Sequence, residues 1–173
     1  MNRGPKTIAL AVGVTALTAI FGGAAHALPA QRQLRAAPQH VISFEPPAGW
    51  ERAATPPSSR LLATWSHHDG ARLSFAAQTV AADVGADKLY AESMRSLEKQ
   101  GWAITKADRQ TGKVTVDASL DKGKRVARQI YLVESGFAYV ITLVAPAEQA
   151  TQRTHDLDDA MTGLKLGTSD DRK

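Results

Sequence analysis

The sequence predicts an α+β protein in which an antiparallel β-sheet of about six or seven strands is covered by two amphipathic helices. Three observations favour this class. Short segments with alternating apolar residues recur along the chain, joined by short connectors that contain glycine. Two longer segments have the 3.6-residue apolar period of helices buried on one side. The composition is 43% hydrophobic and 22% charged with no cysteine, as in a globular domain that folds without disulfides.

The first 27 residues have the order of a secretory signal peptide. Arg3 and Lys6 give a basic start, an apolar run over 7–21 follows, and small residues up to Ala27 form an A-x-A cleavage site. The run is shorter than the roughly 20 residues of a membrane-spanning helix, so we expect cleavage after Ala27 rather than a retained anchor. The absence of cysteine excludes lipid attachment at this site. We therefore expect a periplasmic or secreted protein with no stable membrane anchor after cleavage.

Removal of this segment also changes the charge. The whole chain has a formal net charge of +4, and the loss of Arg3 and Lys6 lowers it to +2. So small a surplus gives little support for nucleic acid as a partner. We expect residues 28–39 to form a flexible leader, 40–166 a single α+β domain, and 167–173 a disordered tail.

Seven strands are expected in the domain, over 41–44, 61–66, 73–79, 102–106, 113–120, 125–134 and 137–145. The turn between 61–66 and 73–79 contains Asp69 and Gly70, a dipeptide suited to the positive φ angles of tight hairpins. The connectors at 110–112, 121–124 and 135–136 are short and contain glycine, so neighbouring strands should be antiparallel.

Two helices are expected, one after Asp83 and one after Pro146. Asp83 can cap the first helix and Gly101 suits its end. The predicted apolar side of the first helix consists of Ala86, Leu89, Tyr90, Ser93, Met94 and Leu97. Pro146 suits a first helical position, and the second apolar stripe consists of Ala150, Thr154, Leu157, Ala160, Met161 and Leu164.

The order of these elements carries a family resemblance. The segment 44–50 contains the P-x-G-W pattern Pro47-Ala48-Gly49-Trp50, a helix follows the first hairpin, and an aromatic-rich strand over 137–143 precedes the closing helix. In these features residues 40–166 resemble the PsbP/Mog1-like superfamily, including its bacterial periplasmic DcrB-type branch. The resemblance implies an αβα sandwich and a non-enzymatic accessory or binding role, because most members of the superfamily are not enzymes. No functional residue carries over from it.

Two groups of residues could bind a metal. His67 and His68 lie beside Asp69 at the tip of the predicted hairpin. Adjacent strand residues point to opposite faces, so these two histidines are not expected to converge. His155 and Asp159 share one face of the second helix, where they would make a two-ligand clip rather than a closed site. A solvated turn and a solvated helix face are the favoured interpretations, and no cofactor is predicted.

A basic group is the main candidate for partner binding. Residues 106–128 carry a net charge of +4, and the cations nearest the hairpin ends are Lys122, Lys124, Arg125 and Arg128. Such a patch suits an envelope protein or an anionic surface. The alternative interpretation is that these exposed charges keep the turns of the sheet soluble and its edges unpaired.

Trp50 and Trp102 each follow a glycine at the boundary of an element. There a ring can plug the end of the core or line a pocket, and the core interpretation is favoured. Trp65 falls on the apolar side of its strand and is predicted to be core.

Two functions from different classes remain. The favoured one is an exported non-catalytic accessory protein that presents a sheet or hairpin surface to an envelope protein, with no nucleic acid as partner. The alternative is a periplasmic protein that binds a small ligand or a metal, with or without weak hydrolytic activity. Hydrolase and nucleotide-binding motifs such as G-x-S-x-G, H-E-x-x-H and the P-loop do not occur in the sequence, so an enzyme is not expected.

Overall fold

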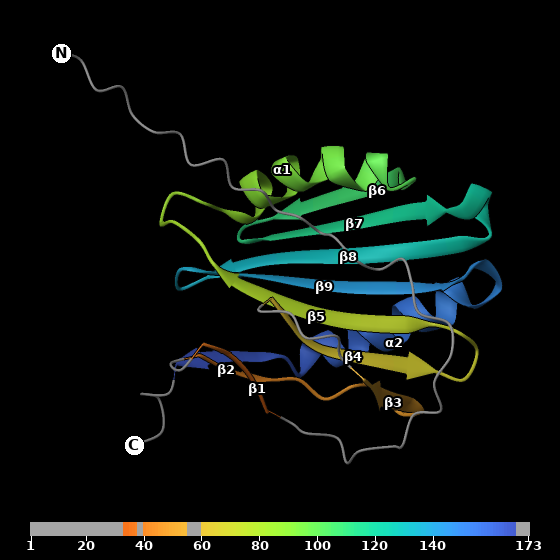
Figure 1. Ribbon diagram of the computed structural model, residues 1–173, viewed down its shortest axis with the longest axis horizontal. Helices are drawn as coiled ribbons and strands as arrows, with labels where there is room; N and C mark the ends of the chain where they lie inside the picture. Colours follow the sequence, from red (N-terminus) through yellow and green to blue (C-terminus); the bar gives the residue numbers. More distant parts are fainter. Residues whose placement is uncertain (1–32, 38–39, 55–59, 169–173) are drawn as a thin grey trace.

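The computed structural model describes residues 33–37, 40–54 and 60–168. The main sheet has seven strands in the order β3-β4-β5-β9-β8-β7-β6, and all its neighbours are antiparallel. These strands are β3 (Trp50–Ala53), β4 (Leu61–His67), β5 (Arg72–Thr79), β6 (Ala103–Gln110), β7 (Lys113–Leu120), β8 (Arg125–Glu134) and β9 (Phe137–Pro146). The predicted class is confirmed, with α1 (Ala86–Lys99) and α2 (Ala150–Thr162) covering the sheet (Figure 1).

A second, three-stranded sheet has the order β1-β2-β10. It contains β1 (Gln33–Ala37), β2 (His40–Ser43) and β10 (Lys165–Thr168), and both outer strands pair antiparallel with β2. The predicted leader over 28–39 and tail over 167–173 are therefore wrong where these strands form. Their pairing partners are supplied by the fold, which local sequence cannot reveal. The signal peptide prediction, and the rest of the leader and tail, lie outside the described residues.

The strand predicted over 41–44 is thus not part of the main sheet. The end of that sheet is formed instead by β3, where the sequence analysis predicts no strand. β3 has only four residues, of which Trp50 is buried and Glu51 exposed. A strand this short carries too little alternation to be recognised before its partner β4 is known.

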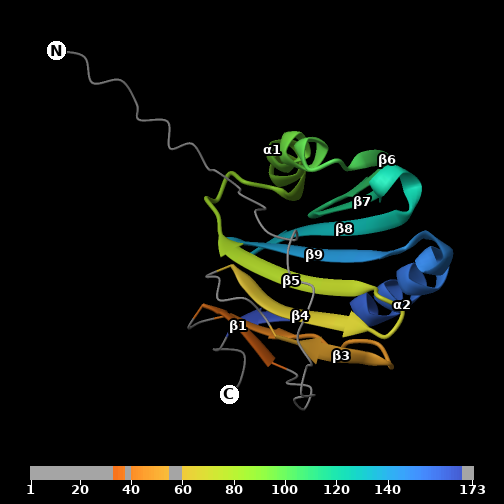
Figure 2. The same ribbon diagram turned by 45° about the vertical axis from the view of Figure 1, so that its right-hand side comes forward.

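The two helices lie on opposite faces of the main sheet (Figure 2). On one face, Leu89 and Tyr90 of α1 pack against Val114, Val116 and Tyr131 of β7 and β8. The buried side of α1 agrees with the predicted one, except that Met94 is half-buried. The helix begins after Gly85, which has no side chain that could cap it. The expected cap, Asp83, instead accepts a hydrogen bond from Lys88 at 2.7 Å.

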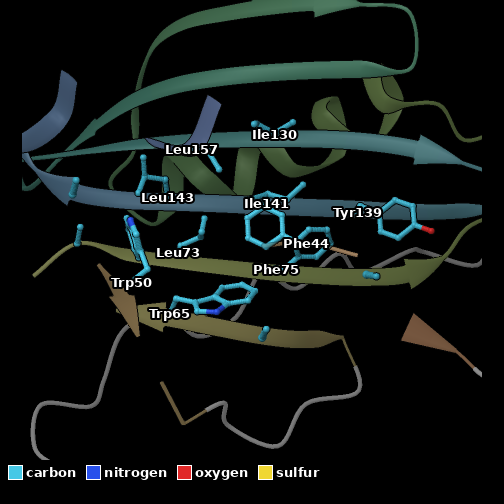
Figure 3. Close-up of a cluster of buried hydrophobic side chains, with 14 residues drawn as sticks. Phe44, Trp50, Trp65, Leu73, Phe75, Ile130, Tyr139, Ile141, Leu143 and Leu157 are labelled. Atoms are coloured by element: carbon cyan, nitrogen blue, oxygen red, sulfur yellow. The ribbon is translucent and has the colours of Figure 1, made fainter. Parts of the chain in front are cut away.

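The other face holds the largest core. Trp65, Phe75 and Ile141 of the main sheet pack there with Leu157 of α2 and with Phe44, which follows β2 (Figure 3). Phe44 lies 5.3 Å from Trp65 and 5.6 Å from Phe75 between ring centroids. Burial of one such side chain stabilises the fold by roughly 2 kcal/mol. Leu157 is 1% exposed and so fixes α2 against the sheet.

Candidate functional site

Three of the four cations predicted to bind a partner lie where β7 connects to β8: Lys122 and Lys124 in the turn, and Arg125 at the first residue of β8. The turn consists of the 3-10 helix η1 (Asp121–Gly123) followed by Lys124. Asp121 and Lys122 have φ angles of 51° and 57°, and Gly123 has a φ of 86°. The left-handed region costs roughly 1–2 kcal/mol for a residue with a Cβ. Two such residues in succession make this turn a strained segment.

Two backbone hydrogen bonds hold the turn in this conformation. The Lys124 N–H donates to the Asp121 carbonyl at 3.3 Å, and the Ala147 N–H donates to the Lys124 carbonyl at 3.0 Å. Ala147 begins the 3-10 helix η2 (Ala147–Gln149), which leads into α2. The turn is therefore tied to the connection between β9 and α2, at the same end of the molecule (Figure 1).

The cations of this turn face solvent. Lys122 and Lys124 are exposed, and neither forms an ion pair within the part of the chain that the structure describes. Arg125 is 42% exposed, and its Nη1 lies 3.9 Å from Asp121 Oδ2, a distance at which a surface pair contributes little. Lys122, Lys124 and Arg125 thus form an exposed group, which we call the basic turn.

The structure separates Arg128 from the basic turn. Its Nε and Nη2 donate to the two oxygens of Asp117 at 2.7 and 3.0 Å, and its Nη1 donates to Asp158 Oδ2 at 2.8 Å. The hydrogen bonds to Asp117 raise the pKa of Arg128, and its side chain is only 19% exposed. Arg128 therefore joins β7, β8 and α2, and its charge is not available to a partner.

Beside this ion-pair group lies a solvent-open hollow of about 190 Å³. Its floor is the polar side of β6 and β7, and Asp158 of α2 forms one wall. Its lining carries three cations (Lys106, Lys113 and Arg128), three carboxylates (Asp108, Asp117 and Asp158), and the uncharged Gln110 and Thr115. Because the charges balance, the hollow does not select an ion of one sign.

His67 and His68 do converge, contrary to the expectation for adjacent strand residues. Their ring centroids are 4.2 Å apart. β4 ends at His67, so His68 belongs to the turn, where the alternation of a strand no longer applies. His68 is exposed, whereas the His67 side chain is 6% exposed and lies against Trp50 and Gly49.

His67 belongs to a chain of charges that joins the β4–β5 hairpin to α2. Its Nδ1 lies 2.9 Å from Asp69 Oδ1, and Asp69 Oδ2 lies 3.0 Å from Arg153 Nε. Arg153 in turn pairs with Asp156. The Asp69 Oδ2 and Arg153 Nε atoms are buried without a hydrogen-bond partner, so their contact is electrostatic rather than an aligned hydrogen bond. These groups connect elements of the fold and leave little access for a substrate.

Asp69 also shapes the hairpin itself. Its Oδ1 accepts a hydrogen bond from the Ala71 N–H at 3.0 Å, an Asx-turn. Burial raises the pKa of Asp69, but the Ala71 amide, His67 and Arg153 together outweigh it and hold the pKa below the usual 3.8. The carboxylate is therefore ionised at neutral pH.

The second predicted pair, His155 and Asp159, lies on the solvent side of α2. His155 Nδ1 is 3.0 Å from Asp159 Oδ2, and the two side chains are 71% and 69% exposed. Across residues 33–37, 40–54 and 60–168, no group of three or more His, Asp or Glu side chains is arranged to hold a metal ion.

Trp50 and Trp102 lie in the core rather than in a pocket. Each is 8% exposed; Trp50 belongs to the core on the α2 face, and Trp102 packs with Leu97 at the end of α1. The Trp50 Nε1 is buried without a hydrogen-bond partner. Both rings therefore close ends of the apolar core.

The sequence analysis did not identify the partners of these residues. Asp117 and Asp158 were not expected to hold Arg128, and Arg153 was not expected to reach the hairpin. Asp158 is 30 residues from Arg128 in sequence, so no local spacing could have indicated the contact. The alternation of β7 could have placed Asp117 on the face opposite Val116, but not beside α2.

Comparisons with known proteins address the fold. No protein-family model matches the sequence, and a comparison with curated proteins gives no match. Among solved structures, the chain is similar to LpqN, described as involved in cell envelope biogenesis of Mycobacterium tuberculosis, with a TM-score of 0.54 and 15% identity over 76% of this chain and 86% of LpqN. It is also similar to cyanobacterial PsbP (CyanoP) from Synechocystis sp. PCC 6803, with a TM-score of 0.55 and 14% identity over 86% of this chain and 98% of CyanoP.

These likenesses confirm the fold that the sequence resemblance implied. The chain has the PsbP/Mog1-like α+β fold, in which an antiparallel sheet lies between helices. At this level of identity the likeness is one of fold alone. Within the described part of the chain, no helix has both the length and the apolar character needed to cross a bilayer.

Proposed function

We propose that this protein is an exported, non-catalytic accessory protein of the cell envelope that docks an acidic protein surface through the basic turn. The observation that carries the proposal is the conformation of Asp121 and Lys122, two successive residues with positive φ. Strain of this kind persists where the surrounding structure fixes the backbone, and it is common at binding segments. Here the hydrogen bond from Ala147 to the Lys124 carbonyl fixes it.

The charge of the turn supports an acidic partner. Lys122 and Lys124 are exposed on a backbone that is already ordered, so little conformational entropy of the backbone is lost on binding. Cations on such a surface steer an acidic partner toward it and fix its orientation. Arg128 takes no part, because Asp117 and Asp158 already neutralise it.

Two observations support the cell envelope as the location of the protein. The first 27 residues have the order of a signal peptide. LpqN, which shares the fold, is described as involved in cell envelope biogenesis. Determination of the N-terminus of the exported protein tests this part: we expect Leu28, whereas a retained Met1 in a cytoplasmic fraction would contradict export.

The burial of His67, the side chain most similar to a general base, supports a non-catalytic role. His67 and Asp69 form a pair of the kind that acts as a general base, but the imidazole is 6% exposed. A Cβ at residue 49 would lie 3.1 Å from His67 Nε2, so the free nitrogen faces backbone rather than a cleft. A base must reach the proton that it removes, and this geometry favours a packing role.

Crosslinking in intact cells tests the docking proposal. We expect the wild-type protein to capture a reproducible envelope protein, and the double variant Lys122→Glu/Lys124→Glu to lose it. The matched control is Arg95→Glu/Lys165→Glu, which reverses two exposed cations on α1 and β10 and should capture the same protein. Equal capture by both double variants would contradict docking through the basic turn.

A further inference from the structure

β6 is the outer strand of the main sheet, and one of its edges faces no other strand in the described part of the chain. It ends the strand order of the sheet and pairs only with β7. Residues 105–110 are all exposed. An edge of this length presents a row of backbone N–H and C=O groups that can pair with another strand.

The register with β7 determines which groups point outward. Gln110 pairs with Lys113 across the two residues Thr111 and Gly112, and the residues that close such a turn bond to each other. Hydrogen-bonded and non-bonded pairs then alternate along β6. Lys106 and Asp108 therefore bond to β7, whereas Ala107 and Arg109 turn their N–H and C=O groups outward.

Charge selects one way for two copies of β6 to pair antiparallel. A two-fold axis at Lys106 would oppose two lysines, an axis at Asp108 would oppose two carboxylates, and an axis at Arg109 would oppose two guanidinium groups. Only an axis at Ala107 opposes unlike charges. In that register Lys106 of each copy lies opposite Asp108 of the other, which forms two ion pairs.

The local structure is compatible with this register. The two Ala107 residues at the axis are small, and their outward groups can bond to each other. The opposed Lys106 and Asp108 fall at non-bonded positions, where Cα atoms are about 4.5 Å apart and side chains are closest. Neither Lys106 nor Asp108 forms an ion pair in the described residues. Asp108 accepts a long hydrogen bond from Gln110 Nε2, at 3.4 Å, and a carboxylate has further lone pairs with which to accept from a lysine. Arg109 does not interfere, because its Nε lies 3.1 Å from Asp87 on the α1 side.

We propose that β6 is a dimerisation edge, which pairs with β6 of a second copy of this chain about a two-fold axis at Ala107. The two main sheets then form one continuous antiparallel sheet. A bulge limits the length of the pairing, because the β6–β7 register shifts between Ile104 and Lys106 and the Thr105 side chain donates to the Asp117 carbonyl at 3.0 Å. The short interface predicts a weak dimer that forms as concentration rises. This edge is separate from the basic turn.

Sedimentation velocity over a concentration series tests the proposal, with protein purified from cells that express the full coding sequence. We expect the wild type to shift from monomer to dimer. Lys106→Asp and Asp108→Lys each oppose like charges, and each should weaken dimerisation by about tenfold or more. An equimolar mixture of these two variants restores both ion pairs in the mixed dimer, and so does the exchange Lys106→Asp/Asp108→Lys within one chain. Both should dimerise like the wild type.

Two further measurements keep the test decisive. Circular dichroism spectra should be the same for all charge variants, because both side chains are exposed. Ala107→Pro removes an outward N–H and should abolish the dimer. A wild type that stays monomeric to its solubility limit would overturn the proposal. It would show that Lys106 and Asp108 instead keep the edge of the sheet from pairing. Mixed variants that fail to dimerise would overturn it as well.

Discussion

Arg128 and Asp117 face each other across β8 and β7, and the guanidinium donates to both carboxylate oxygens, at 2.7 and 3.0 Å. The third contact of Arg128, to Asp158, reaches α2. One half-buried side chain thus connects two strands and a helix. Because of these contacts, the charge of Arg128 is not available to a partner. Of the four cations predicted to bind a partner, only the three of the basic turn remain exposed.

Replacement of Arg128 should destabilise the fold. Arg128→Met keeps the apolar stem but leaves Asp117 and Asp158 without their cation, and we expect a loss of about 1–3 kcal/mol in the free energy of unfolding. Arg128→Lys should recover only part of it, because an ammonium group cannot bond to both carboxylate oxygens in the same way. Urea denaturation measures both. A midpoint for Arg128→Met equal to that of the wild type would show that the ion pairs contribute nothing.

Two glycines should differ in their response to alanine. Gly70 has a φ of 89° in the β4–β5 turn, and a Cβ there would meet nothing within 4 Å. Gly70→Ala should therefore cost about 1 kcal/mol from backbone conformation alone. Gly49 has a φ of 86°, and its Cβ would lie 3.1 Å from His67 Nε2, so Gly49→Ala should cost more. Thermal unfolding of the two variants ranks them, and the reverse order would contradict the packing of His67.

Asp69 should make stability depend on acidic pH. Because its folded-state pKa is lowered from 3.8, the contribution of its charge is complete above that value and disappears as pH falls through the folded pKa. Asp69→Asn keeps an oxygen for the Ala71 amide but removes the charge. We expect it to be less stable than the wild type by about 1 kcal/mol at pH 7. The difference should shrink as pH falls below 3.8 and vanish once the folded carboxyl is protonated, and a difference that does not shrink with acid would refute an electrostatic role.

Two buried tyrosines should make stability depend on alkaline pH. Burial raises the pKa of Tyr131 from the usual 10.0, and it raises the pKa of Tyr139 to about 12. The folded state therefore holds both protons at pH values where the unfolded chain loses them. Stability should be constant below pH 10 and fall as pH rises from 10 through the folded values.

Phenylalanine variants separate these two tyrosines. Tyr139→Phe should remove only the contribution of Tyr139 to the alkaline loss, which falls between pH 10 and about 12, and leave that of Tyr131. Tyr131 donates to Gln129, which in turn donates to Thr142, so Tyr131→Phe also leaves a buried acceptor unpaired and should be less stable at neutral pH by about 1–3 kcal/mol. Urea denaturation at several pH values measures both effects. An unchanged alkaline slope in both variants would exclude these side chains as its cause.

The sequence predicted those parts of the fold that depend on local periodicity. The apolar side of α1 was found from residues such as Leu89 and Leu97, because a helix repeats its buried positions every three to four residues. The β4–β5 turn was found from Asp69 and Gly70, since few dipeptides tolerate positive φ. Each of these signals lies within one short segment of the sequence.

Features that depend on distant pairing were not predictable. β10 forms because it pairs with β2, which lies more than a hundred residues earlier in the chain. A four-residue strand contains no pattern from which that partner could be predicted. The same holds for the candidate site. Lys122, Lys124, Arg125 and Arg128 form one basic group in sequence, but Arg128 is separated by Asp117 and Asp158, one of them on α2.

A photo-crosslinking side chain placed at residue 122 gives the most direct test of docking through the basic turn. The same side chain at residue 95, on the exposed face of α1, is the matched control. We expect a discrete adduct with an envelope protein in intact cells from position 122 and none from position 95, and we expect it to weaken with added salt. No adduct at 122, or the same adduct from both positions, would contradict docking at this turn.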